Sequence, residues 1–215
     1  MEQMHFERED FSQQDLAGQI YRHCRFILCD FSRANLTDTQ FIDCSFIESG
    51  DSQGCDFAYA QLKDASFKGC NLSFANFRGA QCFGLELRET NLQGADFQQA
   101  SFTNYISHNT YFCSAYISAC NLSYCNFEDV KFEECELFEN RWNGANLLGV
   151  SFVGSDLSRG EFSQEQWRQC VWHKVNLTHV DLDGVDIRYV DFTGVQICDW
   201  QQEQLLNQLG IVVLS

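Results

Sequence analysis

Residues 71–80 read NLSFANFRGA and residues 32–41 read SRANLTDTQF, and both stretches repeat one five-residue unit. The unit has a small residue, a polar residue that is often Asp or Asn, a central Leu or Phe, and two further residues that are mostly polar. The central large residue recurs at every fifth position, and all but three of the 20 phenylalanines lie in this register. Cys82 is the exception in a series that runs over Phe6–Phe46, Phe57–Phe102 and Phe112–Ile197.

A period of five fits neither regular helix nor flat strand. Residues five apart on a helix point about 140° away from each other, and on a strand they lie on opposite faces. The chain must therefore turn a corner about every five residues, so that each central residue enters one continuous interior. The small residue two positions earlier lies on the same side of an extended segment and points inward as well.

These units resemble the pentapeptide repeat family over most of the chain. The resemblance implies an all-β solenoid, a right-handed quadrilateral β-helix with four repeats per turn, over residues 1–198. The period alone also allows three sides. The chain has no proline, as suits a coil whose backbone N–H groups pair with the coils above and below it.

Nine of the 12 cysteines occupy the small inward position, which predicts core packing as small apolar side chains. They are Cys24, Cys29, Cys44, Cys55, Cys70, Cys120, Cys125, Cys135 and Cys170. Many cysteines without a signal peptide or membrane span predict a cytoplasmic protein with free thiols.

The sequence contains no group of residues in a pattern typical of a catalytic or metal-binding site. The five histidines fall at different phases of the repeat, and the cysteines lack the close spacing of zinc ligands. Phosphate-binding glycine loops, nucleophile elbows and calcium nonapeptides are absent from the sequence. We expect no metal, no cofactor and no enzymatic activity.

The net charge of −16 disfavours direct nucleic-acid binding, which needs a basic stripe. It also suits a solvated surface that keeps a long stack soluble. About nine turns at about 4.8 Å give a rod about 43 Å long. Duplex DNA of that length carries about 25 negative charges. The net charge of the rod per unit length is therefore about two-thirds of that of duplex DNA.

The series breaks twice, which predicts projecting loops at residues 47–54 and 103–113. Phe46 and Phe57 are out of phase, and the segment between them is polar with two glycines. The second segment is free of Asp, Glu, Lys and Arg and has Ser107 where a large residue is expected, although an irregular coil in register is the alternative. Candidate contact residues in the two loops are Glu48, Ser49, Asp51, Gln53, Tyr105, Ile106, His108, Asn109, Thr110 and Tyr111.

Residues 199–215 do not follow the five-residue repeat. Asp199 with Gln202 predicts a capped helix start, Gly210 its end, and residues 211–214 a strand-like run. This segment is expected to cap the open end of the solenoid. A second expected role is dimerisation through apolar residues, namely Leu205, Leu206, Leu209, Ile211 and Val213.

The two loops, together with SFIESG, YFCSAYIS, NLSYCNF and the ending ICDWQQEQLLNQLGIVVL, resemble the Qnr group of pentapeptide repeat proteins. The resemblance implies an acidic homodimeric rod that mimics DNA, binds the bacterial type II topoisomerases DNA gyrase and topoisomerase IV, and protects them from quinolones. It implies no direct nucleic-acid or membrane partner. The alternative is a structural interaction scaffold, or an immunity factor against a DNA-targeting toxin.

Overall fold

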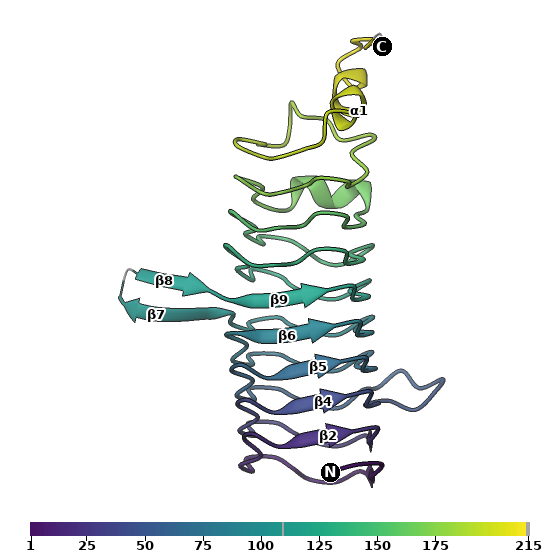
Figure 1. The fold of residues 1–215 in the computed structure, drawn as a ribbon, viewed down its shortest axis with the longest axis vertical. Helices are drawn as coiled ribbons and strands as arrows, with labels where there is room; N and C mark the ends of the chain where they lie inside the picture. Colours follow the sequence, from purple (N-terminus) through teal and green to yellow (C-terminus); the bar gives the residue numbers. More distant parts are fainter. Residues whose placement is uncertain (109, 214–215) are drawn as a thin grey trace.

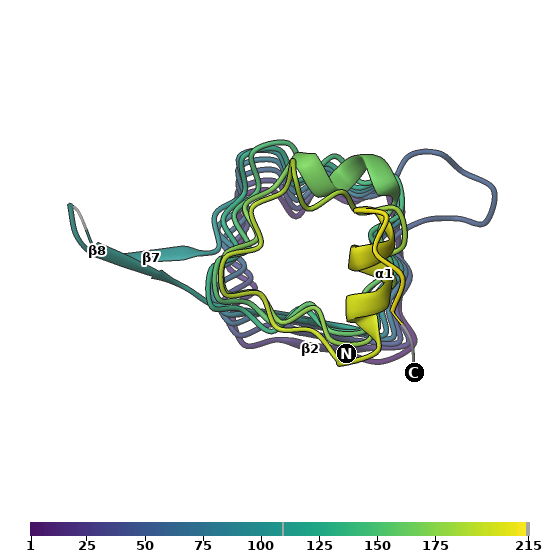
Figure 2. The ribbon, with the colours of Figure 1, turned by 90° about the horizontal axis from the view of Figure 1, so that it is seen from above.

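The computed structural model describes residues 1–108 and 110–213 and has the shape of a rod (Figure 1). The chain winds as a stack of four-sided coils, with the N-terminus at one end and helix α1 at the other. The square outline is plain along the rod axis (Figure 2). The quadrilateral β-helix expected from the resemblance is thus confirmed, and the number of sides that the period left open is four.

Most strands are only three or four residues long, because each side of a coil is short. One side carries a five-stranded parallel sheet in the order β2-β4-β5-β6-β9, and we call it the sheet side. The strands are β1 His5–Glu7, β2 Ile20–Arg22, β3 Arg25–Ile27, β4 Gln40–Ile42, β5 Ser66–Lys68, β6 Leu85–Arg88, β7 Thr103–Ser107, β8 Thr110–Cys113 and β9 Ala115–Ser118. The described helices are the 3-10 helix η1, Gln164–Arg168, and α1, Gln201–Asn207.

The central residues stack in the core from coil to coil. Phe57 lies between Phe31 and Phe77, with ring centroids 4.9 Å away on both sides and nearly parallel rings. Backbone hydrogen bonds hold the same spacing, since the N–H of Phe57 donates to the C=O of Asn76 at 2.7 Å. The inward position is filled by small residues, as predicted, and Ala60 and Ala75 are both buried.

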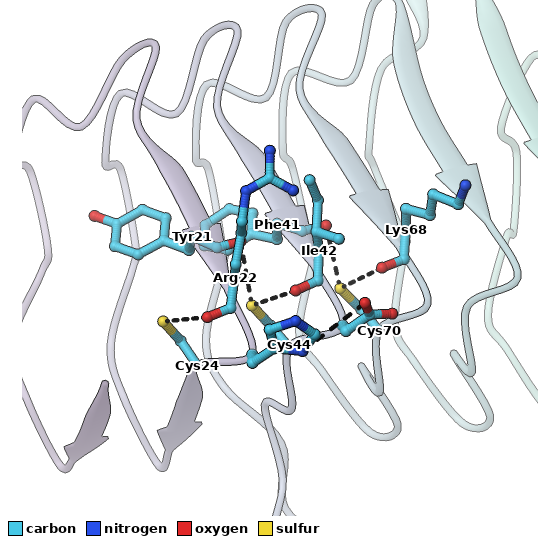
Figure 3. Close-up of polar contacts among 10 residues, drawn as sticks. Tyr21, Arg22, Cys24, Phe41, Ile42, Cys44, Lys68 and Cys70 are labelled. Atoms are coloured by element: carbon cyan, nitrogen blue, oxygen red, sulfur yellow. Dashed lines mark hydrogen bonds and ion pairs between the residues drawn. The ribbon is translucent and has the colours of Figure 1, made fainter. Parts of the chain in front are cut away.

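The cysteines of the inward position pack as predicted, and all 12 are free. Cys24, Cys44 and Cys70 form a column on three successive coils (Figure 3). Each thiol donates to a backbone carbonyl, as Cys44 does to Ile42 at 3.3 Å. Burial raises the pKa of Cys120 to about 12, so this thiol stays protonated at neutral pH. Cys120 thus behaves as a core residue rather than as a reactive thiol, whereas the hydrogen bond with Cys70 lowers the pKa of Cys44 to about 7.

The corners explain the last two positions of the unit. The residue two places after a central one has a positive φ, for example 55° at Asp64 and 75° at Gly84. Glycine adopts this conformation at least cost. At Gly84 space is limiting too, because a Cβ there would lie 2.0 Å from the Asp64 carboxylate of the coil before it.

The two breaks are insertions at corners. Paired residues are 20 apart in an uninterrupted coil, as Tyr21 and Phe41 are, but 26 apart for Phe41 and Phe67 across the first break. They are 30 apart for Leu87 and Ile117 across the second. The breaks therefore insert six and ten residues. The length of the second insertion is a multiple of five residues. The large residues after it therefore stay in the same five-residue register as those before it.

Phe112 is consequently not the core residue that its place in the series predicts. It lies in β8, outside the coil, and its side chain is 42% exposed. Strands β7 and β8 form an antiparallel hairpin over residues 103–113, so the alternative of an irregular coil in register is wrong.

The C-terminal segment differs from its prediction in two ways. The N-cap of α1 is Trp200 rather than Asp199, and residues 211–213 are not a strand, while Leu214 lies outside the described residues. The side chain of Gln201, not a capping box, secures the helix start: its Nε2 donates to the C=O groups of Leu177 and Val180 at 2.8 and 2.7 Å. Neither of the two described helices is long and apolar enough to cross a membrane.

We predict that Phe77→Ala destabilises the fold by about 3–5 kcal/mol, because it leaves a cavity in a close-packed aromatic stack. Phe77 is fully buried and stacks on Phe57 and Phe97 at 4.9 and 4.6 Å. Urea unfolding followed by circular dichroism measures the loss.

Phe74→Ala is the matched control, since Phe74 lies three residues away at a corner and is 41% exposed. We expect it to cost less than about 1 kcal/mol. Equal losses for the two variants would contradict the assignment of the central residue to the core.

Candidate interaction surface

The hairpin β7–β8 projects from the corner between the sheet side and the side before it, and the loop at 47–54 projects from the opposite corner (Figure 2). Each leaves the coil after a central residue and returns before the next inward one. The hydrogen bonding between coils resumes directly after the hairpin, because the C=O of Ser114 accepts from the N–H of Gly84 at 2.8 Å. Both projections therefore stand on an undisturbed rod.

The hairpin presents an exposed, uncharged surface. Tyr105 and Ile106 are 61% and 72% exposed, and His108 and Thr110 are exposed as well. Tyr111 is different, since it is half-buried and turned toward the coil. Asn109, the remaining candidate of this segment, lies outside the described residues.

The first loop is polar and partly tied to the rod. Glu48 forms an ion pair with Arg25, whereas Ser49, Asp51 and Gln53 are exposed. The loop ends at Gly54, where a Cβ would lie 2.5 Å from the backbone oxygen of Ser73. Only glycine fits this close approach without a shift of the backbone.

A group of acidic residues lies on and beside the sheet side. Glu86 of β6 and Glu136 point outward from this side, and Asp64 and Glu134 stand at the corner from which the hairpin leaves. A groove of about 310 Å³ at the foot of the hairpin is lined by these four acids and by Tyr116. Basic side chains neutralise part of the charge, as Arg88 pairs with Glu86 at 3.3 Å. Among the described residues, Glu134 and Glu136 form no ion pair.

Another side carries a column that begins with Asp10 and Asp30 and then alternates between acid and amide over Asp56, Asn76, Asp96 and Asn126. The Nδ2 of Asn76 donates to Asp56 at 2.9 Å, and that of Asn126 donates to Asp96 at 3.1 Å. The same Asp56 oxygen accepts from the N–H of Ala58 at 2.9 Å. We call this the Asp–Asn column. The carboxylates of Asp56 and Asp96 are thus engaged in the fold, in contrast to Glu134 and Glu136, which have no ion pair among the described residues.

The C-terminal end of the rod exposes apolar residues. An open hollow of about 810 Å³ lies between the last coil and α1, lined among others by Phe192, Val195 and Leu205. Leu206 and Val213 are half-buried, while Leu209 and Ile211 are 39% and 48% exposed. The five predicted interface residues thus lie along one segment at the end of the rod.

Sequence reasoning missed the residues at the base of the hairpin. The ring of Phe112 packs edge-on against Phe83, with centroids 5.1 Å apart. Tyr111 contacts Lys131 and Glu133 of the next coil, and the hydrogen bond with Tyr111 raises the pKa of Lys131. Contacts between residues some 20 positions apart leave no local signal, although the coil length of 20 residues points to them. Nowhere in the described part of the chain do three His, Cys, Asp or Glu side chains converge as a metal site.

Comparison with known proteins gives related sequences. Residues 19–97 match the family model for the pentapeptide repeat region. A quinolone resistance pentapeptide repeat protein, QnrB96 of Scandinavium goeteborgense, is 45% identical over 112 residues, which is 52% of this chain and 50% of that protein. The pentapeptide repeat protein VPA0095 of Vibrio parahaemolyticus is 56% identical over 138 residues, or 64% of each chain. These alignments span half to two-thirds of the curated relatives.

The structural similarity extends over the whole chain. Full-length QnrB1, described as a plasmid-mediated fluoroquinolone resistance protein, superposes with a TM-score of 0.94 at 45% identity, covering 98% of this chain and 99% of QnrB1. A trypsin-treated form of QnrB1 gives the same TM-score at 46% identity, covering 99% and 100% of the two chains. The chain therefore belongs to the pentapeptide repeat proteins and, within them, to the Qnr quinolone-resistance group.

Proposed function

We propose that this protein binds the bacterial type II topoisomerases, DNA gyrase and topoisomerase IV, and protects them from quinolone inhibition. The observation that carries the proposal is the match to QnrB1 over 99% of the chain at 46% identity. Similarity over the whole length covers the rod, both insertions and the C-terminal helix together. The proposal places the protein in the cytoplasm, where its partners act, and assigns it no catalytic step.

Mimicry of DNA is the proposed basis of binding. The chain carries a net charge of −16, and a rod of about nine coils at about 4.8 Å is about 43 Å long. The groove of a topoisomerase that receives duplex DNA must be basic to neutralise phosphates. An acidic sheet side, with Glu134 and Glu136 free of ion pairs, offers such a groove complementary charge.

The two projections are the proposed source of specificity. Charge attraction alone is screened by salt and serves mainly to raise the rate of encounter. The exposed Tyr105 and Ile106 provide apolar area of the kind that is enriched at binding hot spots. The hairpin leaves the rod at a corner of the acidic side, so a partner on that side meets both features.

We further propose that two copies join through their C-terminal ends. The last coil leaves core residues such as Phe192 and Ile197 partly exposed around the hollow beside α1. Open ends of solenoids need a cap, and the short helix α1 covers one side only (Figure 2). A second copy would cover the rest.

We predict that the purified protein restores DNA supercoiling by gyrase in the presence of an inhibitory quinolone concentration. The rescue should occur at protein concentrations that leave drug-free gyrase fully active, and should weaken with added salt because charge attraction is screened. The measurement is a plasmid supercoiling assay. Absence of rescue at every concentration up to direct inhibition of gyrase would contradict the function and favour a scaffold or toxin-immunity role.

Deletion of residues 103–112 should strongly weaken protection without unfolding the rod. It joins Phe102 to Cys113 and returns Ile117 to the fifth position after Phe102, which restores an uninterrupted coil. We expect the half-maximal protective concentration to rise roughly thirtyfold or more, as for a hot spot worth about 2 kcal/mol. Deletion of residues 48–53 restores the first coil in the same way and is the companion variant. Full protection by a folded variant lacking 103–112 would exclude the hairpin as a contact.

Leu209→Asp should yield a folded monomer, because it places a charge in the proposed apolar contact between copies. Sedimentation equilibrium should give about half the wild-type mass. Leu148→Asp is the control, since Leu148 is also an exposed leucine, at 55% against 39% for Leu209, and lies far from the C-terminus. A dimeric Leu209→Asp variant would refute this interface.

A further inference from the structure

Side chains at the base of the hairpin contact two coils of the rod. Tyr111 and Phe112 are neighbours in β8, so their side chains lie on opposite faces of the strand. Phe112 packs against Phe83 of the preceding coil, with ring centroids 5.1 Å apart at 84°. Tyr111 reaches the following coil, where its hydroxyl donates to a carboxylate oxygen of Glu133 at 3.0 Å.

Lys131 completes the contact on the Tyr111 side. Its ammonium group lies 4.4 Å from the centroid of the Tyr111 ring and donates to the Tyr111 hydroxyl at 3.2 Å. The other carboxylate oxygen of Glu133 accepts from the hydroxyl of Ser151, one coil further on, at 2.9 Å. The hydroxyl is therefore held between a cation and an anion, and the anion is itself fixed to the rod.

These contacts bear on the direction in which the hairpin projects from the rod as well as on the stability of the hairpin. A two-stranded hairpin is marginal by itself, and nothing in its own backbone pairing sets the angle at which it leaves the rod. The side-chain contacts of Tyr111 and Phe112 set that angle from both sides. Tyr111 also lies opposite Tyr105 in the hairpin, with ring centroids 5.6 Å apart. A shift of Tyr111 would therefore also shift the exposed ring of Tyr105.

We propose that Lys131 and Glu133 are positioning residues which, through Tyr111, hold the hairpin in one orientation for contact with a partner protein. They act through the hairpin and need not touch the partner themselves. The inference rests on the proposed function for the identity of that partner, a type II topoisomerase. The fixing of the hairpin itself is independent of it.

The test uses Lys131→Met, which keeps the aliphatic stem but removes the charge, and Tyr111→Phe, which keeps the ring but removes the hydroxyl. Hydrogen–deuterium exchange of amides in residues 103–113 reports local opening, and the supercoiling assay reports protection. We expect exchange to become roughly three- to tenfold faster, from the loss of a cation–π contact and a charged hydrogen bond, while the global unfolding midpoint is unchanged. The protective concentration should rise by a similar factor.

Two control variants separate orientation from charge and from packing. Lys131→Arg keeps a cation over the ring and should behave as wild type, and Lys63→Met makes the same charge change at an exposed lysine that contacts Asp64 instead. The double variant Lys131→Met with Tyr111→Phe should lose less than the product of the single effects, because both remove one shared contact.

Unchanged exchange in Lys131→Met and Tyr111→Phe would overturn the proposal, and so would faster exchange with full protection. An equal loss of protection in Lys63→Met would assign the effect to net charge and overturn it too. If the wild-type protein itself gave no protection, the proposed function would fall. The exchange rates would then still decide whether Lys131 and Glu133 fix the hairpin.

Discussion

Hydrogen bonds between successive coils are the interaction on which the rest of the structure depends. The N–H of each central residue donates to the carbonyl of a residue 19 positions on in a plain coil, as Phe77 does to Asp96 at 2.7 Å. Three-residue strands have no stability alone, so the coil persists only because every neighbouring coil has the same shape. That requirement makes the central residues of the coils core residues, most inward residues small, and most second corner residues positions of positive φ.

The same requirement determines where the chain is able to depart from the coil. An insertion that begins and ends at one corner leaves the pairing on both sides intact, and both insertions do so. The first insertion returns through Gly54, which approaches the backbone of the next coil too closely for a side chain. The rod thus supports two segments that contribute few of its hydrogen bonds between coils, such as the one from the N–H of Gly54 to the C=O of Phe74 at 3.3 Å.

The period predicted the core, the position of the cysteines and the existence of both insertions from sequence alone. The prediction from the period was wrong for Phe112. An insertion of ten residues leaves the five-residue register unchanged, so Phe112 has the place of a core residue in the sequence but not in the structure. The anchoring of the hairpin by Lys131 and Glu133 was not predicted either. These side chains are 20 or more residues from Tyr111, and their type does not distinguish them from other surface residues.

Helix η1 was not predicted, whereas the C-terminal helix α1 was expected from the end of the repeat pattern. Gln166 donates from Nε2 to the carbonyls of Trp142 and Ala145 at 2.7 and 2.8 Å. Gln201 makes the same pair of bonds to Leu177 and Val180. In both places a buried glutamine amide replaces the backbone donors that a regular coil would supply, as a buried carbonyl requires a partner. Only the spacing to the earlier coil reveals that the two helices are equivalent.

The distribution of charge follows from the stacking as well. Outward residues of successive coils lie about 4.8 Å apart, so a column made only of carboxylates would repel itself. From Asp56 to Asn126 the Asp–Asn column alternates, and the amides of Asn76 and Asn126 donate to the carboxylates before them, whereas Asp10, Asp30 and Asp56 follow one another without an amide between them. On the sheet side Tyr116 lies between Glu86 and Glu136, and at the adjoining corner Gly84 follows Asp64. The next acid of the sheet-side column, Asp156, follows Glu136 directly and accepts from the Nδ2 of Asn176 at 3.0 Å. Among the described residues Glu134 and Glu136 have no ion pair, so their charge remains available to a cationic partner on the side where the hairpin projects.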